Sequence, residues 1–399
     1  MKNPFNARAP VFDANAINAT IQQALASAGI DTTSGPMHDV TETIRRALGT
    51  GRPAEVAPSF NDTMVIDVAA RIIPTGEDTP AAAWQSEASN HEASQAPGSF
   101  ETHQFSNAAG SRAYKVYVPA GQANTPRPLI VMLHGCTQSV DDFAAGTQMN
   151  RLADAHGFLV VYPEQPAQAN ASKCWNWFKP QDQLRGAGEP SLIAGIVREV
   201  AQRHGADPRR IFVAGLSAGA AMAVVLGETY PELFAGVGAH SGLAYGSAHD
   251  IPSALAAMKG GRSGMPGLKQ VSGAAATPRK KAVHAVPIIV FHGDRDHTVQ
   301  HTNGANIVQQ ARDAHGTQPG KTILSASTQT GIAPGGQRFS RTVFAGPDGQ
   351  ARVESWTLHG AGHAWSGGHV SGSYTDGTGP DASAEMVRFF MSLPRAGSA

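Results

Sequence analysis

This chain contains little cysteine, no excess of charge and no long apolar run. Its 399 residues include only two cysteines, Cys136 and Cys174, so we expect no metal site built from cysteines. Lys plus Arg and Asp plus Glu each number 31, and this balance indicates no basic surface for nucleic acid. No apolar run approaches the ~20 residues that span a bilayer, so no transmembrane segment is predicted.

The amino terminus also lacks the apolar segment of a secretory signal. Residues 1–6 read Met-Lys-Asn-Pro-Phe-Asn, which favours a cytoplasmic protein unless a signal has been lost. Hydrophobic residues make up 41% and charged residues 16% of the chain, as in a globular protein with a sizeable core. The composition does not indicate an oligomeric state.

Residues 1–73 differ from the rest of the chain. Thr20–Leu25 and Thr43–Leu48 each place apolar residues four apart, which predicts two short helices in an amino-terminal extension. A mobile extension with only nascent helices is the alternative. Residues 74–99 are rich in Ala, Ser, Glu and Gln and are predicted to be a linker.

Residues 100–399 alternate between strand and helix patterns. Short buried strands are predicted around 128–133, 158–162, 210–214, 234–239, 287–291 and 353–358, after an antiparallel strand at 111–119. Helices are predicted over 143–156, 191–204, 220–226 and 382–393. This alternation indicates an α/β fold whose mostly parallel, doubly wound sheet is covered on both faces. Residues 244–286 interrupt it and form either a lid or a surface loop.

A serine occupies the turn between one of these strands and the following helix. Gly215-Leu216-Ser217-Ala218-Gly219 has the Gly-x-Ser-x-Gly pattern, with an apolar run on either side. A sharp strand-to-helix turn exposes such a serine, and the flanking glycines remove Cβ atoms that would clash. The pattern therefore predicts that Ser217 is a nucleophile, although a Gly-rich turn without catalytic function has the same sequence.

An activated serine needs a base and a carboxylate that orients the base. Asp296 and Asp294 follow the strand at 287–291, and we favour Asp296 because it lies further past the strand end. Asp294 is expected instead to brace the turn through backbone N–H groups. His363 follows the last strand in the order Ser, acid, His, while its neighbour His359 is expected to pack.

Acyl transfer also requires two N–H donors for a developing oxyanion. The residue after the nucleophile, Ala218, is expected to supply one of them. The other is expected from Cys136, because it follows His134-Gly135 at the end of a buried strand.

Four motifs together resemble esterases of the polyhydroxybutyrate (PHB) depolymerase family. They are Leu-His-Gly-Cys-Thr-Gln at 133–138, Cys-Trp-Asn-Trp-Phe at 174–178, Gly-Leu-Ser-Ala-Gly at 215–219 and Gly-His-Ala-Trp at 362–365. The resemblance runs from about residue 110 to residue 393. It implies an α/β-hydrolase fold in which Ser217, Asp296 and His363 are nucleophile, acid and base, with no cofactor. Members of the family cleave polyhydroxyalkanoate esters, and relatives cleave feruloyl or acetyl esters of plant polysaccharides.

The resemblance also implies a disulfide between Cys136 and Cys174, because both match cysteines of the family. Such a bond suits an extracytoplasmic site, whereas the absence of a signal suits the cytoplasm. Trp175, Trp177 and Trp365 either line an apolar substrate groove or pack in the core.

The sequence therefore predicts a serine carboxylesterase that acts on hydroxyalkanoate polymers or oligomers through an acyl-enzyme. A feruloyl or acetyl esterase uses the same machinery and is the first alternative. A hydrolase-like binding protein without catalytic activity is the second.

Overall fold

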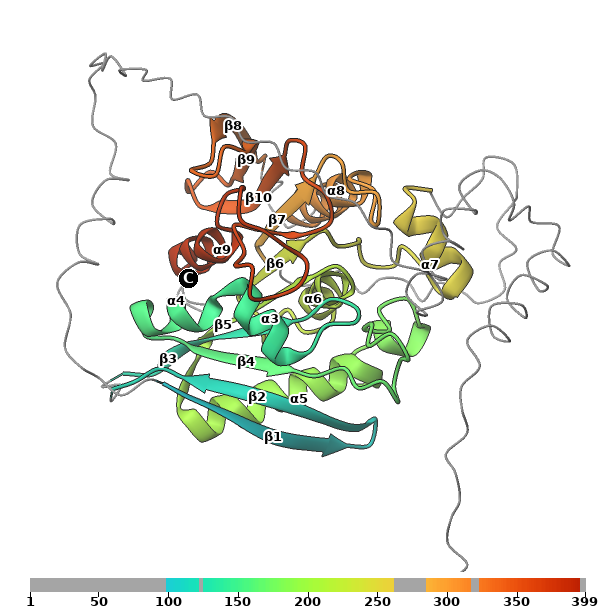
Figure 1. Ribbon diagram of the computed structural model, residues 1–399, viewed down its shortest axis with the longest axis vertical. Helices are drawn as coiled ribbons and strands as arrows, with labels where there is room; N and C mark the ends of the chain where they lie inside the picture. Colours follow the sequence, from blue (N-terminus) through green and yellow to red (C-terminus); the bar gives the residue numbers. More distant parts are fainter. Residues whose placement is uncertain (1–97, 122–124, 262–284, 317–322, 395–399) are drawn as a thin grey trace, which may run out of the picture. The chain divides into compact units, whose positions relative to one another are not determined.

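The computed structural model describes residues 98–121, 125–261, 285–316 and 323–394 (Figure 1). The predicted extension at 1–73, nearly all of the linker and most of the 244–286 insertion lie outside these ranges. The larger strands are β1 (Ser99–Asn107), β2 (Gly110–Val118), β3 (Arg127–Leu133), β4 (Leu159–Pro163), β5 (Ala206–Leu216), β6 (Gly236–His240), β7 (Ile288–Gly293), β8 (Ser325–Ile332), β9 (Arg338–Ala345) and β10 (Ala351–Leu358). A separate pair is formed by β11 (Trp365–Ser366) and β12 (Thr375–Asp376). The helices are α3 (Val140–Thr147), α4 (Met149–His156), α5 (Gly188–His204), α6 (Ala218–Thr229), α7 (Ile251–Met258), α8 (Thr302–Gly316) and α9 (Ala382–Ser392), with a 3-10 turn at Pro180–Gln183.

Ten strands form one sheet in the order β1-β2-β4-β3-β5-β6-β7-β10-β9-β8. The strands from β4 to β10 in this order are parallel, and the flanking strands add antiparallel edges at both ends. Because parallel strands end at the same edge of a sheet, the loops after β3, β5, β6, β7 and β10 meet there. The predicted mostly parallel α/β sheet is confirmed.

Two hydrophobic cores cover the two faces of the sheet. Alternate residues of β3 enter different cores: Leu129, Val131 and Leu133 enter one, while Ile130 and Met132 enter the other. Helices α5, α6 and α8 pack in the first core, and α3, α4 and α9 pack in the second (Figure 1). Both faces of these strands are thus buried, which explains why their sequences are continuous apolar runs.

Several features differ from the sequence-based prediction, among them α8, for which no helix was predicted. Strand β1 begins where the linker was expected to end, and β8 and β9 form an additional hairpin. The helix expected over 143–156 is two helices, because Gln148 has a left-handed φ of 54° and ends α3. Within the 244–286 insertion, the described part contains α7, whose N-cap Asp250 accepts a hydrogen bond from the Ser253 amide.

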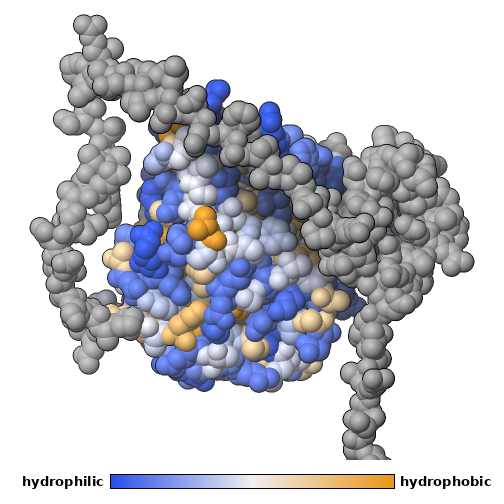
Figure 2. Space-filling model, in the orientation of Figure 1, coloured by the Kyte–Doolittle hydropathy of each residue, from blue (hydrophilic) through white to orange (hydrophobic). Residues whose placement is uncertain are grey.

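The surface in Figure 2 is mostly hydrophilic, with hydrophobic colours in small separate areas. Exposed large apolar side chains are dispersed over several elements, as is normal for a globular protein. They are Leu184, Ile251, Leu255, Ile323, Ile332, Val370 and Tyr374. No helix among the described residues is long and apolar enough to cross a membrane.

Buried histidines predict an acid-labile fold. Burial lowers the pKa of His315 to about 4, and the nearby Arg352 charge lowers the pKa further. The unfolded chain, with an ordinary histidine pKa of about 6.5, binds a proton in the pH range where folded His315 does not. Stability must therefore fall as pH falls from about 6.5 to about 4.

We expect the loss of unfolding free energy between pH 7 and pH 4 to be about 3 kcal/mol smaller in His315→Leu than in the wild-type protein, because leucine does not titrate. Urea unfolding of both proteins at each pH measures the difference in slope, whatever the absolute stability of the variant. Parallel stability curves for the two proteins would contradict the prediction.

Candidate active site

Ser217 lies at the turn between β5 and α6, where the backbone is strained. Its φ of 58° and ψ of −119° are unusual for a residue other than glycine. A Cβ on Gly219 would lie 2.1 Å from the Leu133 carbonyl oxygen, and one on Gly215 would also clash with Gly219. The Ser217 amide donates to the His240 carbonyl oxygen at 2.9 Å. The two glycines thus permit close packing of the turn against the end of β3, and the Ser217 amide bonds it to the end of β6.

Asp296 and His363 are joined at the carboxyl edge of the sheet. The Nδ1 atom of His363 donates to Oδ2 of Asp296 at 2.7 Å, while the Thr298 and Val299 amides donate to Oδ1 at 3.0 and 2.8 Å. The Asp296 side chain is fully buried. Burial alone would raise its pKa, but the bond from His363 and the Val299 amide hold the pKa below its usual value. Asp296 is therefore an ionised carboxylate that fixes one nitrogen of His363.

The neighbouring Asp294 pairs with a different histidine. It accepts from the Gly360 amide at 2.7 Å and from Nδ1 of His359 at 3.0 Å. The Nε2 atom of His359 lies 2.8 Å from the Ser340 hydroxyl oxygen. Although this set repeats the residue types of a catalytic triad, Ser340 lies within strand β9 rather than on an exposed turn. The set connects the loop after β7 with the loop after β10.

His240 connects the serine turn with the loop that carries His363. Its carbonyl oxygen binds the Ser217 amide, and its Nε2 accepts from the Ser366 amide at 3.0 Å. Its ring stacks on Trp365, two residues after His363, with centroids 5.2 Å apart. Complete burial, followed by the nearby histidines, lowers the pKa of His240 to about 3 and keeps the ring neutral.

The structure therefore brings the serine turn and the histidine loop onto one buried support. Among the hydrogen bonds of the described residues, none joins the Ser217 hydroxyl to His363. Bonds of this kind are often long in unliganded enzymes.

The two amides expected to bind an oxyanion lie on adjacent loops. Strand β3 pairs with β5 so that Leu133 lies opposite Gly215, which places the loop after β3 beside the serine turn. Ala218 is the first residue of α6, where helical N–H groups lack intrahelical partners. No acceptor among the described residues takes the amide hydrogen of Ala218 or of Cys136. Both donors are thus available to a ligand.

His134 fixes the orientation of the Cys136 amide. Its Nε2 accepts from the Gln165 amide at 3.1 Å, so its Nδ1 carries the proton and donates to the Gly135 carbonyl oxygen at 2.7 Å. Burial lowers the pKa of His134 to about 4, which keeps this neutral form. The Gly135 carbonyl and the Cys136 N–H belong to one planar peptide and point in opposite directions. Holding the carbonyl therefore aims the N–H.

Cys136 and Cys174 form a disulfide, with Cα atoms 4.2 Å apart, as the family resemblance implied. The Thr137 amide adds a hydrogen bond to the Ser172 carbonyl oxygen at 2.7 Å. The loop that carries the Cys136 amide is therefore attached to the tryptophan-rich loop at two adjacent points.

A buried glutamate that no sequence motif marks holds the tryptophan-rich loop. Glu189, at the start of α5, accepts from the amide of Asn176 at 2.7 Å, from its side chain at 2.6 Å and from Gln165 at 2.5 Å. Burial raises the pKa of Glu189, and nearby Asp182 raises it further. The side chain of Gln165 also donates to the Cys174 carbonyl oxygen at 2.9 Å. Gln165 follows β4 by two residues, so its place at the catalytic edge was a signal that sequence reasoning missed.

The three tryptophans considered for substrate binding are nearly inaccessible to solvent: Trp175 is 0%, Trp177 6% and Trp365 1% exposed. Trp175 donates its ring N–H to the His134 carbonyl oxygen, and Trp365 donates to the Ser383 hydroxyl. Their burial and these bonds show that they pack within the loops of the site. Their contact with substrate stays a prediction.

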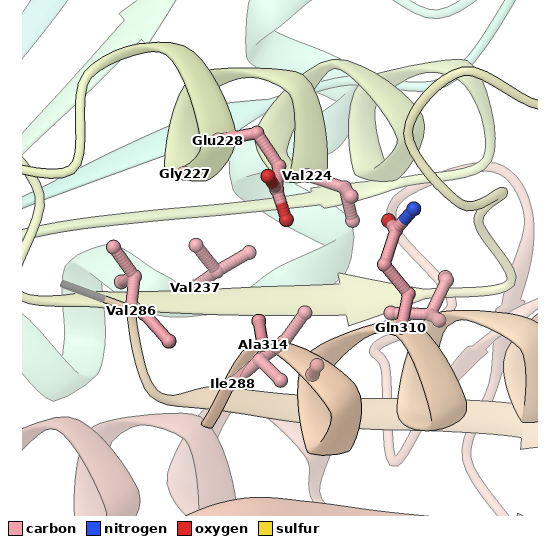
Figure 3. A pocket seen from close by; sticks show the side chains of 11 residues that line it. Val224, Gly227, Glu228, Val237, Val286, Ile288, Gln310 and Ala314 are labelled. Carbon is pink, nitrogen blue, oxygen red and sulfur yellow. The ribbon is translucent and has the colours of Figure 1, made fainter. Parts of the chain in front are cut away.

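A cavity of about 40 Å³ lies away from these residues, between α6, α8 and the starts of β6 and β7 (Figure 3). Gly227 and Glu228 line it from the end of α6 opposite to Ser217, roughly 15 Å along the helix axis. It is therefore no part of this site.

Within the described ranges, no group of three or more His, Cys, Asp or Glu side chains could hold a metal ion.

This chain is similar to several known proteins. The family model described as esterase PHB depolymerase matches residues 112–319. Poly(3-hydroxyalkanoate) depolymerase C of Paucimonas lemoignei is 35% identical over 257 residues, which cover 62% of this chain and 57% of that protein. Feruloyl esterase B of Neurospora crassa is 38% identical over 145 residues, 36% of this chain and 48% of that protein. The chain thus spans about half the length of these curated relatives.

Among solved structures, an acetyl xylan esterase from Aspergillus awamori matches with a TM-score of 0.55 at 20% identity. The match covers 74% of this chain and 100% of that one. At this level of identity the likeness concerns the fold, and it agrees with the expected α/β-hydrolase architecture.

The disulfide should contribute strongly to stability. It joins residues 38 positions apart, and a cross-link of that span removes about 4 kcal/mol of chain entropy from the unfolded state. We expect replacement of both Cys136 and Cys174 by alanine to lower the free energy of unfolding in urea by up to this amount. Reduced wild-type protein, without any substitution, is the control and should lose a similar amount. Equal stability of the oxidised and reduced proteins would contradict the prediction.

Proposed function

The chain belongs to the esterase PHB depolymerase family, and from that premise we propose that it hydrolyses carboxylic esters through an acyl-enzyme formed on Ser217. One observation carries the assignment of roles. The buried, ionised Asp296 binds Nδ1 of His363 at 2.7 Å, beside the strained turn that carries Ser217. The bond supplies the acid and base of the arrangement that activates a serine, and it supports the proposal that Ser217 is the nucleophile.

The reaction follows from the proton positions. Because Asp296 holds the Nδ1 proton, Nε2 of His363 accepts the proton of Ser217 as the hydroxyl oxygen attacks the ester carbonyl. The amides of Cys136 and Ala218 stabilise the oxyanion, and His363 then protonates the leaving alcohol. Water, activated by the same imidazole, releases the acid and restores Ser217. Asp296 remains ionised throughout and stabilises the imidazolium.

We propose esters of hydroxyalkanoates, as polymers or oligomers, as the substrates. The support is the similarity to poly(3-hydroxyalkanoate) depolymerase C over 257 residues. Feruloyl or acetyl esters of polysaccharides are the alternative. Feruloyl esterase B of Neurospora crassa and acetylxylan esterase A of Aspergillus oryzae are both similar to this chain. Rates on hydroxybutyrate oligomers, methyl ferulate and acetylated xylan distinguish the two.

The two aspartates provide a matched test of the proposed site. Asp296→Asn should lower kcat for p-nitrophenyl butyrate by about 10³- to 10⁴-fold, because the amide no longer holds the Nδ1 proton of His363. Asp294→Asn should lower it by less than about tenfold, because Asp294 binds His359 instead. Ser217→Ala should abolish acyl-enzyme formation. Equal losses in the two aspartate variants, or turnover by the Ser217 variant, would contradict these roles.

His134 provides a test of the oxyanion geometry. His134→Phe keeps an aromatic, slightly larger ring but removes the bond that holds the Gly135 carbonyl, so the Cys136 N–H is no longer aimed. We expect kcat to fall roughly 10- to 100-fold with little change in KM, because the lost interaction forms only in the transition state. Steady-state kinetics measures the split, and circular dichroism checks the fold. A change confined to KM would contradict the prediction.

A further inference from the structure

Tyr374 connects the loop that carries His363 with the loop that carries the Cys136 amide. It immediately precedes β12, which pairs with β11, and its carbonyl oxygen accepts from the Trp365 amide at 2.7 Å. Its phenolic oxygen lies 3.2 Å from the Thr137 hydroxyl oxygen, one residue from Cys136. Tyr374 therefore links Trp365, two residues after the proposed base, with Thr137, the neighbour of a proposed oxyanion donor.

The ring is held in place yet reaches solvent. Tyr374 is 47% exposed. Its φ of 53° is a left-handed backbone conformation that residues other than glycine rarely adopt. The preceding Ser373 donates to Asp142 through its amide at 2.8 Å and through its hydroxyl at 2.6 Å. Gln138 donates to Asp142 and accepts from the Gly135 amide, both at 2.9 Å. A strained, exposed aromatic residue that is anchored in this way is typical of a functional position.

The hydrogen bonds determine which group the ring offers to a ligand. The Thr137 hydroxyl donates its hydrogen to the Cys136 carbonyl oxygen at 2.6 Å. In the contact between Thr137 and Tyr374, the phenol must therefore be the donor. With its hydrogen used, the phenolic oxygen retains only its capacity to accept. The group that complements it is a hydroxyl of the ligand.

We propose that Tyr374 is a substrate-binding residue that accepts a hydrogen bond from a hydroxyl group a few bonds from the scissile ester. The inference rests on the proposed function and specifies the substrate further. The hydroxyl has two chemical sources. It lies on the acyl side in a terminal hydroxyalkanoate unit, whose hydroxyl is unesterified, or on the alcohol side in a sugar ester. Internal units of a polyester carry no such donor.

Three small esters test the proposal on the full chain. Ethyl butyrate has no hydroxyl, ethyl 3-hydroxybutyrate has one on the acyl side, and 2-hydroxyethyl butyrate has one on the alcohol side. In Tyr374→Phe, kcat/KM for one or both hydroxylated esters should fall about three- to tenfold relative to ethyl butyrate, the effect of a single neutral hydrogen bond. The affected ester identifies the source of the hydroxyl.

Tyr117→Phe is the matched control. The Tyr117 hydroxyl donates to Asp154 at 2.6 Å, outside the site, so its loss should leave all three ratios unchanged. Equal losses of Tyr374→Phe on all three esters would overturn the proposal, because Tyr374 would then act through Thr137 on the oxyanion loop. Unchanged ratios would also overturn it. Failure of the wild-type protein to hydrolyse any of the esters would overturn the proposed function itself, and this inference with it.

Discussion

The hydrogen bond between Asp296 and His363 is the interaction on which the rest of the site depends. A fully buried carboxylate is costly, and here two amides of its own loop and one imidazole compensate for the lost water. Because its partner lies on the loop after β10, the bond fixes the distance between the ends of two neighbouring parallel strands. His240, which contacts both the serine turn and the loop that carries His363, lies at the same edge of the sheet, as does the glycine-dependent turn at Ser217.

Much of the fold could be predicted from the sequence because buried parallel strands are apolar on both faces. The run at 128–133 in β3 and the strand before Ser217 are examples of this pattern. Strand β8 could not be recognised, because Ser-Ala-Ser-Thr-Gln-Thr-Gly-Ile forms an exposed edge that only the hairpin with β9 defines. The end of α3 at Gln148 was hidden for a similar reason, since a left-handed residue that is neither Gly nor Asn carries little local signal.

The candidate site was predictable where chain order and strand ends restrict the choice. Position alone favoured Asp296 over Asp294 as the partner of His363, and the structure contains that pair. The support was harder to predict, since Gln165 had only its position after β4 as a signal and Glu189 is recognised only through its bonds to Gln165 and Asn176. A buried glutamate at a helix start resembles any acidic residue in a first turn until its partners are known.

The tryptophan-rich loop is attached at two points, by the disulfide at Cys174 and by the carboxylate beneath Asn176. The exposed residues at 167–168 lie before both attachments and before Ser172, whose carbonyl oxygen accepts from the Thr137 amide. Their length and sequence can thus diverge between homologous proteins, or be exchanged in a designed chimera, while the oxyanion geometry is conserved. The architecture separates a part that is free to evolve new surface chemistry from a part that must stay fixed for turnover.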